Sequence, residues 1–304
     1  MLDPRVATFL AVCRTLNYTH AARELNLTQS AVSQHMAHLE RSYGAKLTVS
    51  QGKAMRLTEE GRLLQRAFQL MAHDESLVRR RIEASASKSA LRLRVGATLT
   101  AGEYIVAPAL ARLMRRSDSV RIAVVSRSTE ELVGLMAKGA IDCAFVEGIF
   151  DASAFASDRV CEQELACICA PDHPLAHRSC SWERLLGETL IVRERESGSR
   201  AVLEHALARR NLSLASFSDV VEASSIGVIK AFVREGLGVS FVYEAASALE
   251  CARGALARIE VAGERPVHDI SFVRPKGSAF EDDFKALFEG VCAELGAQPA
   301  QARE

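Results

Sequence analysis

The sequence predicts an α/β protein with a small helical domain in front, and three observations support this. Residues 18–43 contain two short amphipathic segments with helical periodicity around a turn. A longer amphipathic segment follows residue 58 and runs for about 28 residues, or ~40 Å as a helix. From residue 91 onward, strand-like runs alternate with helix-like runs, which is typical of a mostly parallel sheet covered by helices.

Length and charge fit a small domain joined to a larger one. The chain has 304 residues, of which 48% are hydrophobic, so globular cores are expected. The 38 basic and 38 acidic residues cancel over the whole chain. Residues 1–57 alone carry a net charge of about +4, which suits a domain that faces phosphate groups.

Several classes of protein lack support in the sequence. It has no apolar run of about 18 residues and no basic, apolar leader, so we expect a cytoplasmic protein without a membrane partner. The eight cysteines and eight histidines show no metal-ligand spacing, and we expect neither a metal nor another cofactor. No serine-hydrolase, zinc-protease or P-loop motif occurs, and we expect no catalytic residue and no enzyme.

The first three predicted helices form a compact unit. A helix over 4–16 would pack behind two shorter helices, whose small residues Ala21 and Ala22 allow a close crossing. Asn26 and Leu27 fit the turn between them, and Thr28 is placed to cap the second helix. Gly44 would end that helix. The pattern predicts a helix-turn-helix.

The outer face of the helix after Thr28 carries short, uncharged, hydrogen-bonding side chains. Glutamine can bond adenine with two hydrogen bonds in the major groove, and serine can pair with base edges or phosphates. The alternative is an ordinary solvated face of an amphipathic helix. We predict DNA contacts for Thr28, Gln29, Ser30, Ser33, Gln34 and His35.

A hairpin and a long helix follow. Residues 46–57 alternate around a Gln51-Gly52 turn, which predicts a β-hairpin wing carrying Lys53 and Arg56 toward the DNA backbone. Thr58 would cap a helix reaching about residue 86. Nothing nearby in the sequence can bury its apolar stripe, so a partner helix in a homodimer is expected.

The remaining chain reads as two α/β subdomains, because it has too many strands for one compact sheet. Strands are expected at 91–97, 120–126, 141–147, 164–170, 189–193, 219–222, 239–243, 256–261 and 268–274, and helices at 102–116, 129–138, 200–210, 225–235 and 280–295. We place domain boundaries at 1–58 (winged helix-turn-helix), 59–89 (linker helix) and 90–304, with subdomain I at about 90–161 and 268–296 and subdomain II at about 162–267.

Together these residues resemble the LysR-type transcriptional regulators over nearly the whole chain. The similarity rests on Ala21-Ala22, Gln29-Ser30-Ala31-Val32-Ser33, Gly44 and Leu57-Thr58-Glu59, in the order and spacing of the family. The segment from Gly96 to Tyr104 is similar to the branch that regulates carbon fixation and sulfur assimilation. The resemblance implies a winged helix-turn-helix, a dimerising linker helix and a two-subdomain effector domain like that of periplasmic binding proteins. It also implies double-stranded promoter DNA as a partner, and homodimers or homotetramers.

The chain departs from the family pattern at two DNA-binding positions. Ser30 stands where the family usually has proline. Ser50 stands where the wing usually has arginine, so its phosphate contact would pass to Lys53 and Arg56.

Turns after predicted strands supply candidates for an effector site. Ligands of such sheets bind at the carboxyl ends of strands, beside helix N-termini, which favours an anionic group. The alternative is that these hydroxyls are plain helix caps. The resemblance implies effector contacts at Thr100, Ser128 and Ser199. The full predicted set is Thr98, Thr100, Ser126, Ser128, Ser197, Ser199, Arg200 and Ser224.

Two other functions remain open at this point. A redox sensor on the same scaffold would use cysteines such as Cys167 and Cys169, although neighbours on one strand face are poorly placed for a disulfide. A small-molecule binding protein without a DNA role would need export, for which no signal is visible.

Overall fold

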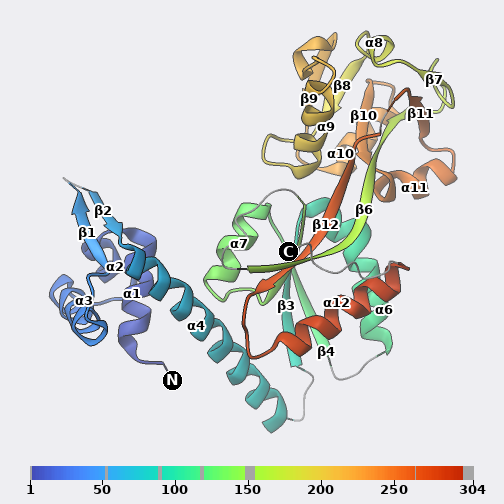
Figure 1. The fold of residues 1–304 in the computed structure, drawn as a ribbon. Helices are drawn as coiled ribbons and strands as arrows, with labels where there is room; N and C mark the ends of the chain where they lie inside the picture. The colour runs from blue at the N-terminus through green and yellow to red at the C-terminus, as the bar shows by residue number, and fades with distance from the viewer. Residues whose placement is uncertain are drawn as a thin grey trace.

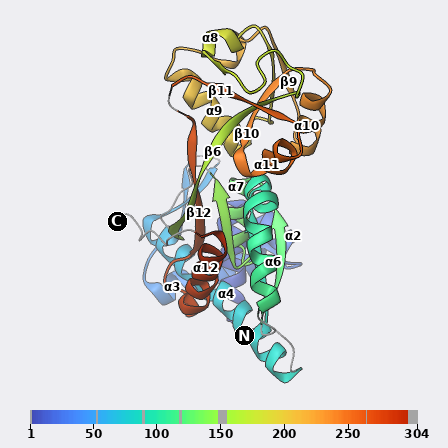
Figure 2. The same ribbon diagram turned by 90° about the vertical axis from the view of Figure 1, so that its right-hand side faces the viewer.

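The computed structural model describes residues 2–51, 54–87, 91–116, 120–147, 155–263 and 265–296. Figure 1 shows a small N-terminal head, a long helix that leaves it, and a larger α/β part at the other end of that helix. The α/β part has two halves joined by two long strands, and Figure 2 shows the same two halves from the side. The predicted fold class is therefore confirmed.

The head is a helix-turn-helix with a wing. Its three helices are α1 (Pro4–Thr15), α2 (Tyr18–Glu24) and α3 (Gln29–Tyr43). Phe9, Ala21, Val32 and Met36 are almost fully buried where these helices meet. The antiparallel wing consists of β1 (Thr48–Gln51) and β2 (Ala54–Leu57), as the alternating pattern predicted. The tip of the wing, with Lys53, lies outside the described residues.

Helix α4 (Glu59–Ala86) has both a buried and an exposed apolar face. Thr58 caps it by accepting the backbone N–H of Gly61. Leu64 and Phe68 pack into the head, and Leu77 packs into the α/β part. This differs from our expectation that only a second chain could bury the stripe, because the α/β part folds back against α4. A row of apolar side chains stays exposed, namely Leu63, Met71, Val78 and Ile82.

Polar contacts also fix α4 to the α/β part. Asp142 is fully buried and accepts hydrogen bonds from Nη2 of Arg80 at 2.6 Å and Nη2 of Arg94 at 3.0 Å. Arg81 forms a two-pronged ion pair with Asp283. A buried carboxylate with two guanidinium partners holds its geometry firmly, because breaking it strands a charge away from water. We call this set of contacts the α4 clamp.

The sheet has two parallel parts separated by antiparallel strands. The strand order is β4-β3-β5-β12-β6-β10-β8-β9, with β11 beside β6, and β7 beside β11. The first half contains the parallel strands β3 (Leu91–Ala97), β4 (Val120–Ser126) and β5 (Cys143–Glu147), and the second half contains β8 (Thr189–Val192), β9 (Asp219–Glu222) and β10 (Val239–Tyr243). The long antiparallel pair β6 (Phe155–Cys169) and β12 (Val267–Pro275) joins the halves. Two shorter strands are β7 (Ser179–Cys180) and β11 (Ala257–Val261).

Helices cover each half. The first half carries α5 (Leu99–Ala101), a π-helical turn (Gly102–Val106), α6 (Ala107–Arg116), α7 (Thr129–Ala137) and α12 (Glu281–Leu295). The second half carries α8 (Trp182–Leu185), α9 (Gly198–Ala208), a 3-10 turn (Leu214–Ser216), α10 (Ile226–Arg234) and α11 (Glu244–Ala252). Separate buried clusters form under them, one around Phe145 and Phe272 and another around Trp182 and Phe241. No helix in the described ranges combines the length and the apolar character needed to span a bilayer.

Some elements differ from the sequence prediction. Strand β6 begins at Phe155, nine residues before the predicted start at 164, because its polar first part gains its strand partner only from β12. Helix α11 was not predicted, since it follows β10 with no turn residue between them. The expected helix 102–116 starts earlier and contains the π-helical turn, which sequence periodicity does not reveal.

Candidate functional site

Helix α3 presents the predicted DNA-reading residues at the outer surface of the head. Gln29, Ser30 and Gln34 are exposed, and Ser33 is half-buried. Within the part of the chain that is described, no hydrogen bond occupies the side chains of Gln29, Ser30 and Gln34. Their donors and acceptors are therefore open to a partner, as base recognition in a groove requires.

Two predicted residues have roles inside the head as well. Thr28 accepts the backbone N–H of Ala31 at 3.1 Å and so caps α3. His35 is half-buried, and its Nδ1 lies 2.8 Å from the hydroxyl of Thr8 on α1. This contact engages Nδ1, and no hydrogen bond from another described residue engages Nε2.

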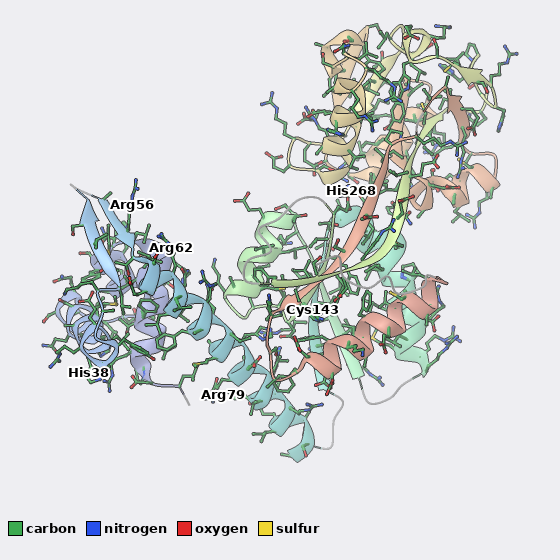
Figure 3. All side chains as sticks on the ribbon, in the orientation of Figure 1. His38, Arg56, Arg62, Arg79, Cys143 and His268 are labelled. Carbon is green, nitrogen blue, oxygen red and sulfur yellow. The ribbon has the colours of Figure 1, made fainter. Side chains whose placement is uncertain are left out.

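Basic side chains flank this face. Arg56 is exposed on β2, and Arg62 follows at the start of α4, where it donates to the carbonyl of Leu57. Figure 3 shows Arg56 on the wing and His38 on α3, both at the end of the molecule remote from the second half of the sheet. The surface therefore combines uncharged hydrogen-bonding side chains at the start of α3 with cations at its margin, the division expected between base contacts and phosphate contacts.

A cavity of about 500 Å³ opens between the two halves of the sheet. Three turns and one strand end line it, all at the carboxyl ends of parallel strands: the turns after β3, β4 and β8, and the end of β5. We call this cavity the cleft. Its lining residues are Thr98, Leu99, Thr100, Ser126, Arg127, Ser128, Thr129, Glu130, Glu131, Glu147, Arg193, Glu194, Glu196, Ser197 and Gly198.

Five of the eight predicted effector residues line the cleft: Thr98, Thr100, Ser126, Ser128 and Ser197. The structure thus gathers turns that are about 100 residues apart in the sequence. Ser128 also caps α7, where it forms a reciprocal capping box with Glu131. Ser197 makes no side-chain cap bond to α9, although it is the first residue before that helix.

The other three predicted residues lie away from the cleft wall. Ser199 is buried behind Ser197, with their hydroxyls 3.0 Å apart. The buried guanidinium of Arg200 points to Glu204 and Glu222 rather than into the cleft. Ser224 is exposed before α10 and is not among the lining residues. Ligand contact by any of the eight stays a prediction.

Two charged residues that line the cleft were not predicted as site residues from the sequence. Glu147 is the last residue of β5, and Arg193 directly follows β8. Both are almost fully buried at the end of an apolar strand. The rule that selected the hydroxyls, position at a strand's carboxyl end, would have found them as well.

Polar contacts cross from one half to the other within the cleft. Oε2 of Glu147 accepts the hydroxyl of Tyr243 at 3.0 Å, and Nη1 of Arg193 donates to the hydroxyl of Thr100 at 3.0 Å. Burial, followed by the Glu147 carboxylate, raises the pKa of the Tyr243 phenol far above its usual value, so the phenol keeps its proton and donates. Burial alone would raise the pKa of Glu194, but hydrogen bonds from Arg193 hold it below its usual value.

No disulfide joins any of the eight cysteines, and each of them is buried or half-buried. All eight are free thiols, and burial raises the pKa of Cys13 and Cys169 to about 12 and of Cys292 to about 11. Burial also raises the pKa of Cys167, which lies two positions from Cys169 on β6. Because the thiolate is the reactive form, these thiols are poor candidates for sensing oxidants. No metal-binding cluster occurs among the described histidine, cysteine, aspartate and glutamate residues.

Known proteins are similar to this chain in sequence and in fold. The HTH-type transcriptional regulator CysL of Bacillus subtilis (strain 168) is 32% identical over 236 residues, covering 77% of each chain. The RuBisCO operon transcriptional regulator of Allochromatium vinosum is 29% identical over 268 residues, covering 85% of each. A full-length OxyR variant from Pseudomonas aeruginosa has the same fold, with a TM-score of 0.66 over 100% of this chain and 99% of that one, at 19% identity.

Family models match both functional regions. The model of the bacterial regulatory helix-turn-helix proteins of the lysR family matches residues 5–62, and the LysR substrate binding domain matches residues 86–294. The first match contains the exposed face of α3, and the second contains the whole cleft. The relatives fall in the branch that the turn after β3 indicated. The chain therefore belongs to the LysR family of helix-turn-helix transcriptional regulators.

Proposed function

We propose that this protein regulates transcription at specific promoters, under the control of a small effector that binds in the cleft. One observation carries the proposal: the cleft is lined from both halves of the sheet, so a bound molecule touches both. A ligand that fits one angle between the halves better than another shifts the balance between those angles. The sequence motivates an anionic group in this effector, held near the helix N-termini.

The DNA contacts belong to the head in this proposal. Gln29, Ser30, Ser33 and Gln34 would read bases in a major groove, with Thr28 and His35 beside them. Arg56, together with Lys53, which lies outside the described residues, would hold the DNA backbone. Residues 1–58, 59–89 and 90–304 would form the three functional parts, with subdomain I at 90–161 and 268–296 and subdomain II at 162–267.

Assembly follows from the exposed side of α4. Leu63, Met71, Val78 and Ile82 recur at near-helical spacing and face solvent in the single chain. A second α4 would bury them, giving a homodimer, and pairs of dimers would give a homotetramer that holds several heads on one promoter. We place the protein in the cytoplasm, without catalytic activity of its own.

The test uses the full-length protein. DNA fragments selected by it from random sequence would be measured by fluorescence anisotropy, with and without a panel of small carboxylates, sulfur and phosphorus oxyanions, and amino acids. We expect a preferred sequence, and a ligand that both raises the melting temperature and changes the affinity for that sequence. A ligand at 100 times its dissociation constant adds ~2.7 kcal/mol of stability, which is easily measured. Binding that is equally strong to random DNA would contradict the proposal.

A further inference from the structure

The cleft contains a buried carboxylate that is not neutralised by a cation. Glu147 is only 3% exposed. Its Oε1 accepts the hydroxyl of Thr98 at 2.9 Å and the backbone N–H of Ala101 at 3.1 Å, and its Oε2 accepts the hydroxyl of Tyr243 at 3.0 Å. All three donors are neutral, and no ion pair joins Glu147 to any other described residue. Burying a charge in this way is costly unless something offsets it.

The two cations of the cleft differ, because Arg193 is buried and bonded to protein groups whereas Arg127 is exposed. Arg193 gives Nε and Nη2 to the carboxylate of Glu194, at 2.8 and 2.7 Å, and Nη1 to Thr100. Arg127 turns back to the carbonyl of Ser126. The lining as a whole has five carboxylates and two guanidinium groups, a formal charge of −3. A doubly charged oxyanion would therefore enter an already negative space.

Glu147 also lies against the start of α9. A Cβ atom added to Gly198 would be 3.2 Å from Oε2 of Glu147 and 3.0 Å from its Cβ. A carboxylate of the protein thus lies directly beside the N-terminus of this helix, within reach of a ligand that is bound there. The carboxylate has about four acceptor positions and uses three, so one remains on Oε2.

We infer that the effector is a zwitterion of the amino-acid type, and that its protonated nitrogen faces Glu147. The anionic group of the same molecule lies near the uncapped N-terminus of α9, beside Ser197. The nitrogen supplies the positive charge that the cleft lacks, and Glu147 selects against ligands that carry only negative charge. This inference rests on the proposed function, because it takes the cleft as the effector site.

The experiment compares ligand classes on the full-length protein by calorimetry. The probes are the L-amino acids, their Nα-acetylated forms, and sulfate, sulfite and phosphate. We expect one or more free amino acids to bind, and acetylation, which removes the positive charge, to weaken binding about tenfold or more. Glu147→Gln should weaken amino-acid binding by a similar factor and strengthen oxyanion binding.

Two control variants separate charge from packing. Glu131→Gln removes another cleft carboxylate, one that is exposed and engaged with Ser128, and should change amino-acid affinity by less than about threefold. Tyr243→Phe removes one bond to Glu147 but keeps its charge, and should also keep amino-acid binding. If Glu147→Gln fails to fold, the acetylation series and Tyr243→Phe still decide the question.

Three results would overturn the inference. Tight binding of an oxyanion by the unaltered protein, no tighter in Glu147→Gln, would show that Glu147 does not exclude anions. Equal binding of acetylated and free amino acids would show that the nitrogen is not recognised. In both cases a ligand that still changes DNA affinity leaves the proposed function intact. If no probe of either class binds or changes DNA affinity, the inference and the effector part of the proposed function both fail.

Discussion

The outer face of α3 and the cleft are both polar, but the polar groups of α3 are exposed whereas several of those of the cleft are buried and bonded to one another. On α3, Gln29, Ser30 and Gln34 are exposed, and the described chain leaves their hydrogen-bonding groups open. In the cleft, Glu147 and Arg193 are buried and bonded to residues of the other half. On the exposed face of α3, water can form hydrogen bonds with the side chains until a binding partner replaces that water. In the cleft, a ligand meets groups that already bond one half to the other, so a ligand that competes for these bonds changes what holds the two halves together.

The largest expected effect is a loss of unfolding free energy when a buried charge of the cleft is removed. Arg193→Ala removes a buried guanidinium from both Glu194 and Thr100. We expect the α/β part to lose about 3 kcal/mol of unfolding free energy. Chemical denaturation followed by circular dichroism measures this. The exposed Arg127→Ala is the control and should stay within about 0.5 kcal/mol of the unaltered protein. A cost for Arg193→Ala no larger than the control's would mean that the cleft is not held by its own bonds.

A change on α3 should affect recognition and leave stability untouched. Gln29→Ala should reduce discrimination between the selected DNA sequence and random DNA by ~1–3 kcal/mol, because a bidentate base contact is lost. The melting temperature should not move, since Gln29 is exposed. Gln163→Ala, on β6 and far from the head, is the control. Unchanged discrimination would remove Gln29 from the base contacts.

Two serines at helix starts sharpen the comparison within the cleft. Ser128 caps α7, and Ser128→Ala should cost about 1 kcal/mol of stability. Ser197 makes no cap bond to α9 and pairs with the Ser199 hydroxyl instead, so Ser197→Ala should cost only that bond, roughly 0.5 kcal/mol. Thermal unfolding of the two variants side by side gives the difference. Equal costs would mean that Ser197 also caps its helix in solution.

The wing should contribute affinity without specificity. Arg56→Ala should weaken binding to selected and random DNA alike, and should lower the slope of log affinity against log salt by ~1 if one phosphate contact is lost. Anisotropy titrations over a range of salt concentrations measure that slope. A specific loss on the selected sequence alone would instead place Arg56 at a base.

The smallest expected effect concerns acid. Because Arg193 lowers the pKa of Glu194 in the folded state, this carboxylate contributes stability above its unfolded pKa, near 4.5, and that contribution is lost as the pH falls through the folded value. Melting temperature measured against pH should therefore decline less steeply below pH 4.5 for Glu194→Gln than for the unaltered protein. Parallel curves would show that the pair forms no more strongly than in the unfolded chain.

The sequence predicted the head more completely than the cleft, and the reason lies in sequence distance. The turn between α2 and α3, the Thr28 cap and the Gly44 stop are all set by residues within a few positions of one another. The partners of Glu147 are 46, 49 and 96 residues away, so no local pattern reveals them. Hydroxyls at strand ends could be listed from sequence, whereas the orientation of Arg200 toward Glu204 and Glu222 required the packed structure. The prediction for β6 was too short for the same reason, because the polar start of this strand depends on β12.

The α4 clamp attaches the first half of the α/β part to the helix that carries the head. Asp142 belongs to the first half, and its bonds to Arg80 tie that half to the helix that carries the head. Asp74 on α4 adds bonds to Ser278 and Ala279, also on the first half's side of the molecule. The first half is therefore fixed to the helix that carries the head, and the second half is joined to the first by β6 and β12. Under the proposed function, a bound effector would change the angle between the two halves while the first half stays fixed to α4, and neighbouring subunits would carry that change to the promoter DNA.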